Sequence, residues 1–317
     1  MTPTPIYEQV SEGVIAVDTE FIRPHMDASH LIVDEGRAAF VDAGTSFSVP
    51  NLLRALAAQD LDVNDVDYLI LTHIHLDHAG GAGQLAAVLP HARVVMHPRG
   101  AAHMIDPTIL IAATKAVYGE ARFTQEYGEI VPIPQERVDV AEDGQRFQLG
   151  RRSLELIYTP GHALHHLCVV DRERGDVFAG DTFGVSYREL DTAAGEFIFP
   201  TTSPTQFDPE QLHASIDRIL AFKPTSIYLT HYSRVGQPDK LGHDLHTDID
   251  AFVSMARGAP EGPGRVEVLG SRMFDYLSAR LAKQGGTVDL AQRHAVLDGD
   301  VSLNAAGLVA WLSRRKA

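Results

Sequence analysis

The chain has 317 residues, of which 44% are hydrophobic and 22% charged, values typical of globular proteins that exclude extended disorder and fibrous structure. Its formal net charge of −15 would repel nucleic-acid phosphates, and its single cysteine excludes an intrachain disulfide and a thiolate-rich zinc site. Because neither a signal peptide nor a membrane-spanning run is recognisable, we expect a cytoplasmic protein with a small-molecule substrate and no nucleic-acid or membrane partner.

Strands and helices are predicted to alternate in the first half of the chain. Short apolar runs bounded by turn residues predict strands at 13–18, 30–44 (as a hairpin), 66–73 and 92–97. Helical spacing of apolar residues predicts helices at 48–59 and 81–90. Residues 100–128 also look helical, and we interpret their aromatic side chains, Tyr118, Phe123 and Tyr127, as core rather than as a lid.

The second half begins with strands and ends in helices. Strands are predicted at 146–150, 153–162, 165–171, 176–181 and 226–233, with a helix at 208–222. Residues 182–207 form a long irregular segment, of the kind that often covers a site. After 236 only helices are predicted, so we expect an α/β catalytic domain over 1–235 and a helical extension over 236–317.

The stretch "LTHIHLDHAG", residues 71–80, places four titratable side chains directly after an apolar strand. His73 and His75 are two residues apart and therefore point the same way in an extended backbone. Asp77 and His78 are adjacent and are expected in a turn that points elsewhere. Such crowding is costly without a compensating cation, and one tetrahedral ion could hardly accept all four side chains, so the spacing predicts a dinuclear site.

Further ligands are expected where other strands end. His162 follows the strand that ends in "YTP", Asp181 ends "VFAGD", and His231 ends "IYLTH". A consistent assignment of two divalent ions follows. One ion is held by His73, His75 and His162, the other by Asp77, His78 and His231, with the Asp181 carboxylate bridging them.

This arrangement predicts hydrolysis, because two cations lower the pKa of a bridging water and so make a hydroxide nucleophile available near neutral pH. Asp77 and Asp181 are the predicted catalytic carboxylates. Asp42 also ends a strand and is expected to orient a ligand histidine through its other ring nitrogen. Zinc is the expected metal, with iron or manganese as alternatives.

The combination of "THIHLDHAGG", "TPGHALHH", "AGD" and "LTHYS", with "VDAG" upstream, resembles the metallo-β-lactamase superfamily over about residues 7–235. The resemblance implies an αββα sandwich with its metals at one edge and the same seven ligands. It places Asp42 at the family's upstream aspartate and His166 at the second histidine of "TPGHALHH", behind the ligands.

Differences between this sequence and particular groups of the family narrow the range of expected activities. Common β-lactamases have cysteine where this chain has Asp181, so β-lactam hydrolysis is not expected. The remaining likeness is to the glyoxalase II, lactonase and phosphodiesterase-like groups, and to a bacterial and archaeal branch of simple metallohydrolases. The expected substrate is a small thioester, lactone or phosphoester, with Tyr187 and Tyr232 as candidates to face it.

Two questions stay open from the sequence. An enzyme similar to the persulfide dioxygenases would hold one iron through residues matching His73, His162 and Asp181. A homodimer is an expected assembly that the sequence does not test.

Overall fold

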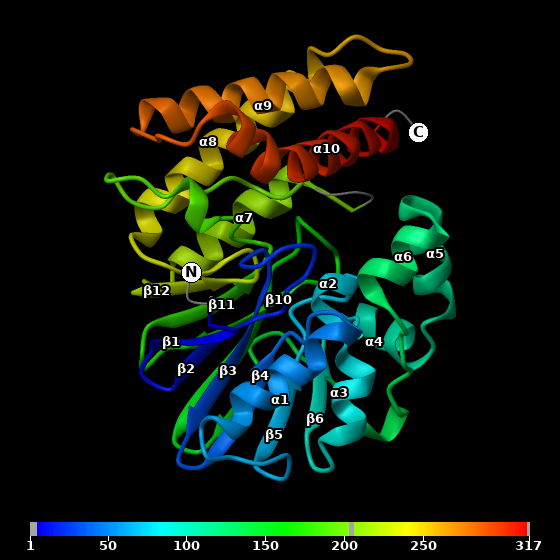
Figure 1. Cartoon of the computed structure of the whole chain (residues 1–317), viewed down its shortest axis with the longest axis vertical. Helices are drawn as coiled ribbons and strands as arrows, with labels where there is room; N and C mark the ends of the chain where they lie inside the picture. The colour runs from blue at the N-terminus through cyan, green and yellow to red at the C-terminus, as the bar shows by residue number, and fades with distance from the viewer. Residues whose placement is uncertain (1–4, 203–205, 316–317) are drawn as a thin grey trace.

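A computed structural model describes residues 5–202 and 206–315 (Figure 1). Its first sheet has seven strands in chain order, with the first four strands antiparallel and the last four parallel. These strands are β1 (Tyr7–Ser11), β2 (Val14–Asp18), β3 (Ala28–Asp34), β4 (Arg37–Val41), β5 (Val66–Ile70), β6 (Arg93–Met96) and β7 (Val138–Val140).

The second sheet has six strands in the order β13-β12-β11-β10-β9-β8. All neighbours are antiparallel except β11 and β12, which are parallel and joined by a helix. The strands are β8 (Arg146–Leu149), β9 (Arg152–Tyr158), β10 (Leu167–Asp171), β11 (Asp176–Gly180), β12 (Ser226–Leu229) and β13 (Ser233–Val235).

A continuous apolar layer lies between the two sheets. Ile32 and Ile70 from the first sheet pack in it with Leu156, Val169 and Phe178 from the second. The middle strands β10 and β11 are buried along their whole length, as expected for strands covered on both faces.

Helices cover the outer face of each sheet, which gives the αββα sandwich (Figure 1). The first sheet packs against α1 (Val49–Ala57), α3 (Ala82–Val88) and α4 (Pro98–Ile105), and the second against α7 (Pro209–Leu220) and α8 (Pro238–Arg257). Pro209 at the first position of α7 and the Asp208 side chain, which accepts from the Gln211 N–H, fix where α7 begins. The predicted fold class is confirmed.

The predicted C-terminal helices are present as α8, α9 (Arg265–Lys283) and α10 (Leu290–Arg314). By length and composition alone α10 could cross a membrane, but 44% of its apolar window is buried. Leu297, Val301 and Leu308 lie in the same core as α9, so packing accounts for this apolar character.

The structure differs from the sequence-based prediction in two further ways: it has additional edge strands, and one predicted helical segment is divided. The short edge strands β1 and β7 were not predicted, because neither has a long apolar run. The predicted helical segment 100–128 divides into α4, α5 (Thr108–Tyr118) and α6 (Glu120–Tyr127), with Gly119 at positive φ between the last two. The helices α5 and α6 lie at the side of the molecule (Figure 1).

Candidate metal centre

The seven predicted ligands gather at one edge of the sandwich, where strands of both sheets end. They lie after β5, in the short helix α2 (Leu76–Ala79), and after β9, β11 and β12: His73, His75, Asp77, His78, His162, Asp181 and His231. Asp77 and His78 lie in α2 rather than in the expected turn. The structure divides the seven side chains into two groups whose ligand atoms lie within 4.8 Å of one another.

The first group contains three imidazoles and one carboxylate. His75 Nδ1 lies 2.9 Å from His73 Nε2 and 3.1 Å from His162 Nε2. Oδ2 of Asp181 lies 3.4 Å from His162 Nε2. These atoms converge on one point, as ligands of one ion must.

The second group contains Asp77, His78 and His231, and it meets the other oxygen of Asp181. Oδ1 of Asp181 lies 3.2 Å from His78 Nε2 and 3.4 Å from His231 Nε2. Oδ2 of Asp77 lies 3.7 Å from each of the same two nitrogens. The two Asp181 oxygens therefore face different groups, which is the arrangement of a bridging carboxylate.

The distances between ligand atoms fit divalent metal ions. Ions such as zinc bind nitrogen and oxygen at about 2.0–2.2 Å in tetrahedral geometry, so two ligands of one ion lie about 3.3 Å apart. His78 Nε2 and Asp181 Oδ1 are buried and make no hydrogen bond in the described part of the chain. Buried polar atoms are costly without partners, and a cation between them would satisfy both.

The ring nitrogens that face away from the two groups have polar partners. Asp42 Oδ2 lies 2.8 Å from Nδ1 of His78, and Thr201 Oγ1 lies 2.7 Å from Nδ1 of His162. Such contacts fix the orientation of an imidazole and leave its Nε2 lone pair for a metal. Asp42 thus lies where the sequence predicted it, against the other nitrogen of a ligand histidine.

Asp27 is a site residue that the sequence analysis missed. Its buried carboxylate lies 2.7 Å from Nδ1 of His231, the position that Asp42 has toward His78. Burial raises the Asp27 pKa to about 6, against the opposing effect of His231. No sequence motif distinguishes Asp27, which lies in a loop, from the many other aspartates of the chain.

His166 supports the backbone of the bridging residue. Its Nε2 accepts a hydrogen bond from the Asp181 N–H at 3.1 Å, and its Nδ1 lies 2.9 Å from Thr159 Oγ1. It is fully buried and does not line the cavity described below. His166 therefore acts on Asp181 and not on a substrate.

The histidines of the two ligand groups differ in their tendency to carry a proton. Burial and neighbouring imidazoles hold the pKa of His73 well below its usual range and lower that of His75 to about 3, so both are neutral and available as ligands. Burial opposes a charge on His78 and His231, yet the surrounding carboxylates raise the pKa of both imidazoles well above normal. The second group thus lies in a negative field that a cation would neutralise.

A cavity of about 790 Å³ opens onto both groups through His75, Asp77, Asp181 and His231. Its walls come from the loop after β2, from α4, α5 and α6, and from α10, which contributes Asp300. A cavity of this size accommodates a small molecule.

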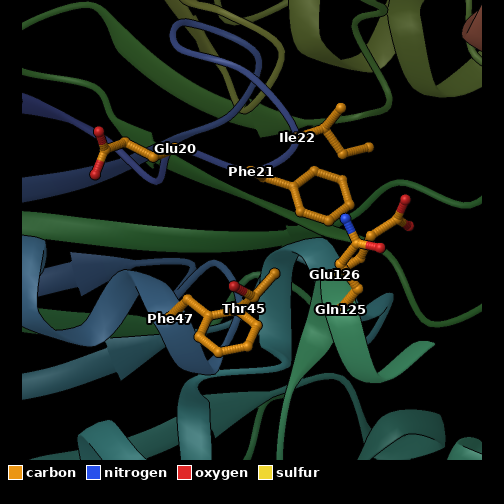
Figure 2. A pocket seen from close by; sticks show the side chains of 7 residues that line it. All are labelled: Glu20, Phe21, Ile22, Thr45, Phe47, Gln125 and Glu126. Atoms are coloured by element: carbon orange, nitrogen blue, oxygen red, sulfur yellow. The ribbon is translucent and has the colours of Figure 1, made fainter. Parts of the chain in front are cut away.

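A smaller cavity of about 280 Å³ lies beside the first one. Figure 2 shows it between Phe21 and Ile22 of the loop after β2, Thr45 and Phe47 below, and Gln125 and Glu126 of α6. Phe21 and Ile22 of this loop and Glu126 of α6 line both cavities, so these side chains lie between them.

The tyrosines predicted to face substrate lie elsewhere. Tyr187 is fully buried in the core, with its hydroxyl 3.4 Å from Asp300 Oδ1, and Tyr232 packs against His25. Neither lines the cavity. Tyr118 and Tyr127 do line it. The prediction that the aromatic side chains of this segment are core is confirmed for Phe123 and Tyr127, which are buried in one apolar cluster, and Tyr118 packs half-buried against that cluster.

Comparison with known proteins identifies the family. The family model of the metallo-beta-lactamase superfamily matches residues 23–231. The chain belongs to this superfamily. With the His and Asp clusters of the site, this membership makes it a metal-dependent hydrolase.

Individual members of the superfamily share only a modest fraction of their sequence with this chain. A metallo-beta-lactamase fold-containing protein of Sulfurisphaera tokodaii is 27% identical over 66% of this chain and 73% of its own. A hydroxyacylglutathione hydrolase of Aeromonas hydrophila is 30% identical over 63% of this chain, which spans only 59% of that enzyme. The crystal structure of a metallo-beta-lactamase family protein from Thermus thermophilus matches with a TM-score of 0.69, 19% identity, and coverage of 98% and 96% of the two chains, and so supports the fold alone.

Proposed function

We propose that the protein is a dinuclear metal-dependent hydrolase of a small ester-type substrate: a thioester, a lactone or a phosphoester. The observation that carries the proposal is the pair of ligand groups sharing Asp181 at the end of a 790 Å³ cavity. The proposed ligands are His73, His75, Asp77, His78, His162, Asp181 and His231.

Two divalent ions, zinc in this proposal, would supply an activated water and polarise the scissile bond. The protein residues hold and orient the site. Neutral imidazoles face the first position, and the Asp181 oxygens face one position each. The carboxylates of Asp42 and Asp27 lie against Nδ1 of His78 and His231 and orient the two rings, so that each Nε2 faces the second position and would act as a ligand when a cation is bound.

The choice of an ester-type substrate has two supports. The cavity is lined by loops and helices on several sides and, at about 790 Å³, has the size of a small-molecule site. The Aeromonas hydrophila relative is named for the hydrolysis of hydroxyacylglutathione, an acylated thiol. The net charge of −15 favours a substrate that is not polyanionic, and nucleic-acid or membrane partners are not part of the proposal.

The competing proposal is a mononuclear iron enzyme that uses oxygen. Such a site needs three protein ligands, and His73, His162 and Asp181 could provide them. It would leave Asp77, His78 and His231 without a role, although carboxylates stand behind both histidines. Buried polar groups are costly without partners, which favours the dinuclear proposal.

The experiment is reconstitution with zinc followed by assays against one acyl thioester, one lactone and one phosphodiester. We expect turnover of at least one of them, abolished by a chelator and by His78→Ala. The matched control is His91→Ala, which removes an exposed histidine outside the site and should leave turnover unchanged. Absence of turnover with all three substrates, in protein shown to contain metal, would contradict the proposal.

A further inference from the structure

The helix α5 has an apolar sequence, "TILIAATKAVY", yet none of its residues is buried. Ile109 is 68% exposed and Val117 is 56% exposed, which places both among the large hydrophobic side chains with the most solvent contact. Single exposed apolar residues are ordinary, but a row of them on one helix marks a binding surface.

The α5 residues that face the 790 Å³ cavity form two adjacent rows, one exposed and one half-buried. Positions four apart lie on the same side of a helix, and the six α5 residues that line the 790 Å³ cavity follow this spacing: Ile109, Ala113 and Val117 in one row, and Leu110, Thr114 and Tyr118 in the other. The helix therefore presents one continuous and largely apolar face to the cavity.

The second row, together with Ile111, attaches α5 to the protein and leaves the first row exposed. Leu110, Ile111 and Tyr118 pack against a small cluster formed by Phe21, Leu76, Phe123, Tyr127 and Ile130. Ile109 and Val117 contribute nothing to that cluster. Their apolar character is thus not needed for the attachment of α5, and the cavity is the place where it can act.

The same cavity reaches the metal centre, because His75, Asp77, Asp181 and His231 line it together with α5. Met26 of the loop after β2 and Leu303 of α10 add apolar surface to the same cavity. A ligand that reaches from the metal centre into the rest of this cavity would contact the α5 face. Ile109 and Val117 are about 12 Å apart along the helix axis, which matches a chain of about eight to ten carbons.

We propose that the cavity binds a substrate with a hydrocarbon acyl chain, and that the α5 face of Ile109, Ala113 and Val117 selects its length. This inference rests on the proposed hydrolase function and specifies the substrate class of the same site. Each methylene that leaves water for this face stabilises the complex, so affinity should rise with chain length until the face is covered.

Binding of straight-chain carboxylates tests the proposal without requiring turnover. Butanoate, hexanoate, octanoate and decanoate are titrated into the zinc-reconstituted protein by calorimetry. We expect the dissociation constant to fall about two- to fourfold per added methylene. A dissociation constant that does not change with chain length would overturn the proposal.

Variants of α5 identify the surface that binds the chain. Val117→Asp should abolish the dependence on chain length, whereas the same substitution at Val268, which is 40% exposed on α9 and does not line the cavity, should preserve it. Ala113→Phe should fill the groove and move the tightest binding to a shorter carboxylate. Identical chain-length profiles in all three variants and the wild type would refute the role of α5.

Two further measurements distinguish failure of the proposed function from failure of the acyl-chain site, and a bound acyl chain from a second copy of the protein. Hydrolysis of p-nitrophenyl esters over the same chain lengths tests the proposed function. If no ester is hydrolysed while carboxylate binding still depends on chain length and on Val117, the proposed function fails and the apolar site stands. Light scattering tests a second copy of the chain as the occupant, and a dimer that dissociates only in Val117→Asp would overturn the proposal.

Discussion

Replacement of Asp27 by Asn tests whether the carboxylate behind His231 tunes the second metal position. In the folded protein Asp27 is fully buried, and its carboxylate lies 2.7 Å from Nδ1 of His231. A polar contact to a charged partner contributes about 1.5–3 kcal/mol and one to a neutral partner about 0.5–1.5 kcal/mol, so replacing the charged Asp27 of this ion pair by Asn should lose about 1–1.5 kcal/mol. That loss corresponds to roughly tenfold weaker metal affinity, which agrees with the effects known for residues behind metal ligands.

The assay is a competition titration of zinc against a chromophoric chelator, which resolves a tight and a weaker site. Asp27→Asn should weaken one site and leave the other unchanged, because no first-group histidine contacts Asp27. Asp34→Asn is the matched control, since Asp34 is also buried but accepts from the Arg151 N–H far from the metals. If Asp27→Asn binds both ions as tightly as the wild type, the role assigned to Asp27 is refuted.

Three further predictions concern the metal centre and its cavity. His73→Ala should remove metal preferentially from the first position and His78→Ala from the second, by at least about tenfold in affinity, as metal analysis of the purified variants can show; full retention of both ions in either would count against the assignment. Asp300→Asn should lower kcat/KM about tenfold through loss of a charged acceptor in the cavity, whereas Asp298→Asn on the exposed side of α10 should not. Nitrocefin turnover should be negligible because a carboxylate, Asp181, stands where common β-lactamases have a thiolate, and a rate like that of a dedicated enzyme would overturn this expectation.

The sequence predicted the site better than its surroundings, for physical reasons. His73, His75, Asp77 and His78 lie within six residues of one another, and crowding of titratable groups is a local signal. The mixed α/β architecture followed from alternating apolar runs, whose periodicity is also local, whereas the αββα sandwich was implied by the family resemblance.

Residues whose role depends on tertiary packing could not be predicted. Asp27 and Asp300 are single acidic residues without a motif, and only the fold brings them to His231 and to the cavity. Tyr187 follows the bridging aspartate by six residues, and the sequence could not show that its side chain turns into the core. Tyr118 was interpreted as core and instead lies half-buried at the cavity, because sequence does not distinguish an aromatic side chain inside the core from one at a cavity wall.

The most direct test of the central claim is metal stoichiometry measured together with oxygen consumption. The protein is purified, analysed for zinc, iron and manganese, and then assayed with an acyl thioester and, separately, with glutathione persulfide at an oxygen electrode. We expect close to two metal ions per chain and thioester hydrolysis without oxygen uptake. One iron per chain with persulfide-dependent oxygen uptake would contradict the dinuclear hydrolase and support the mononuclear oxygen-using enzyme.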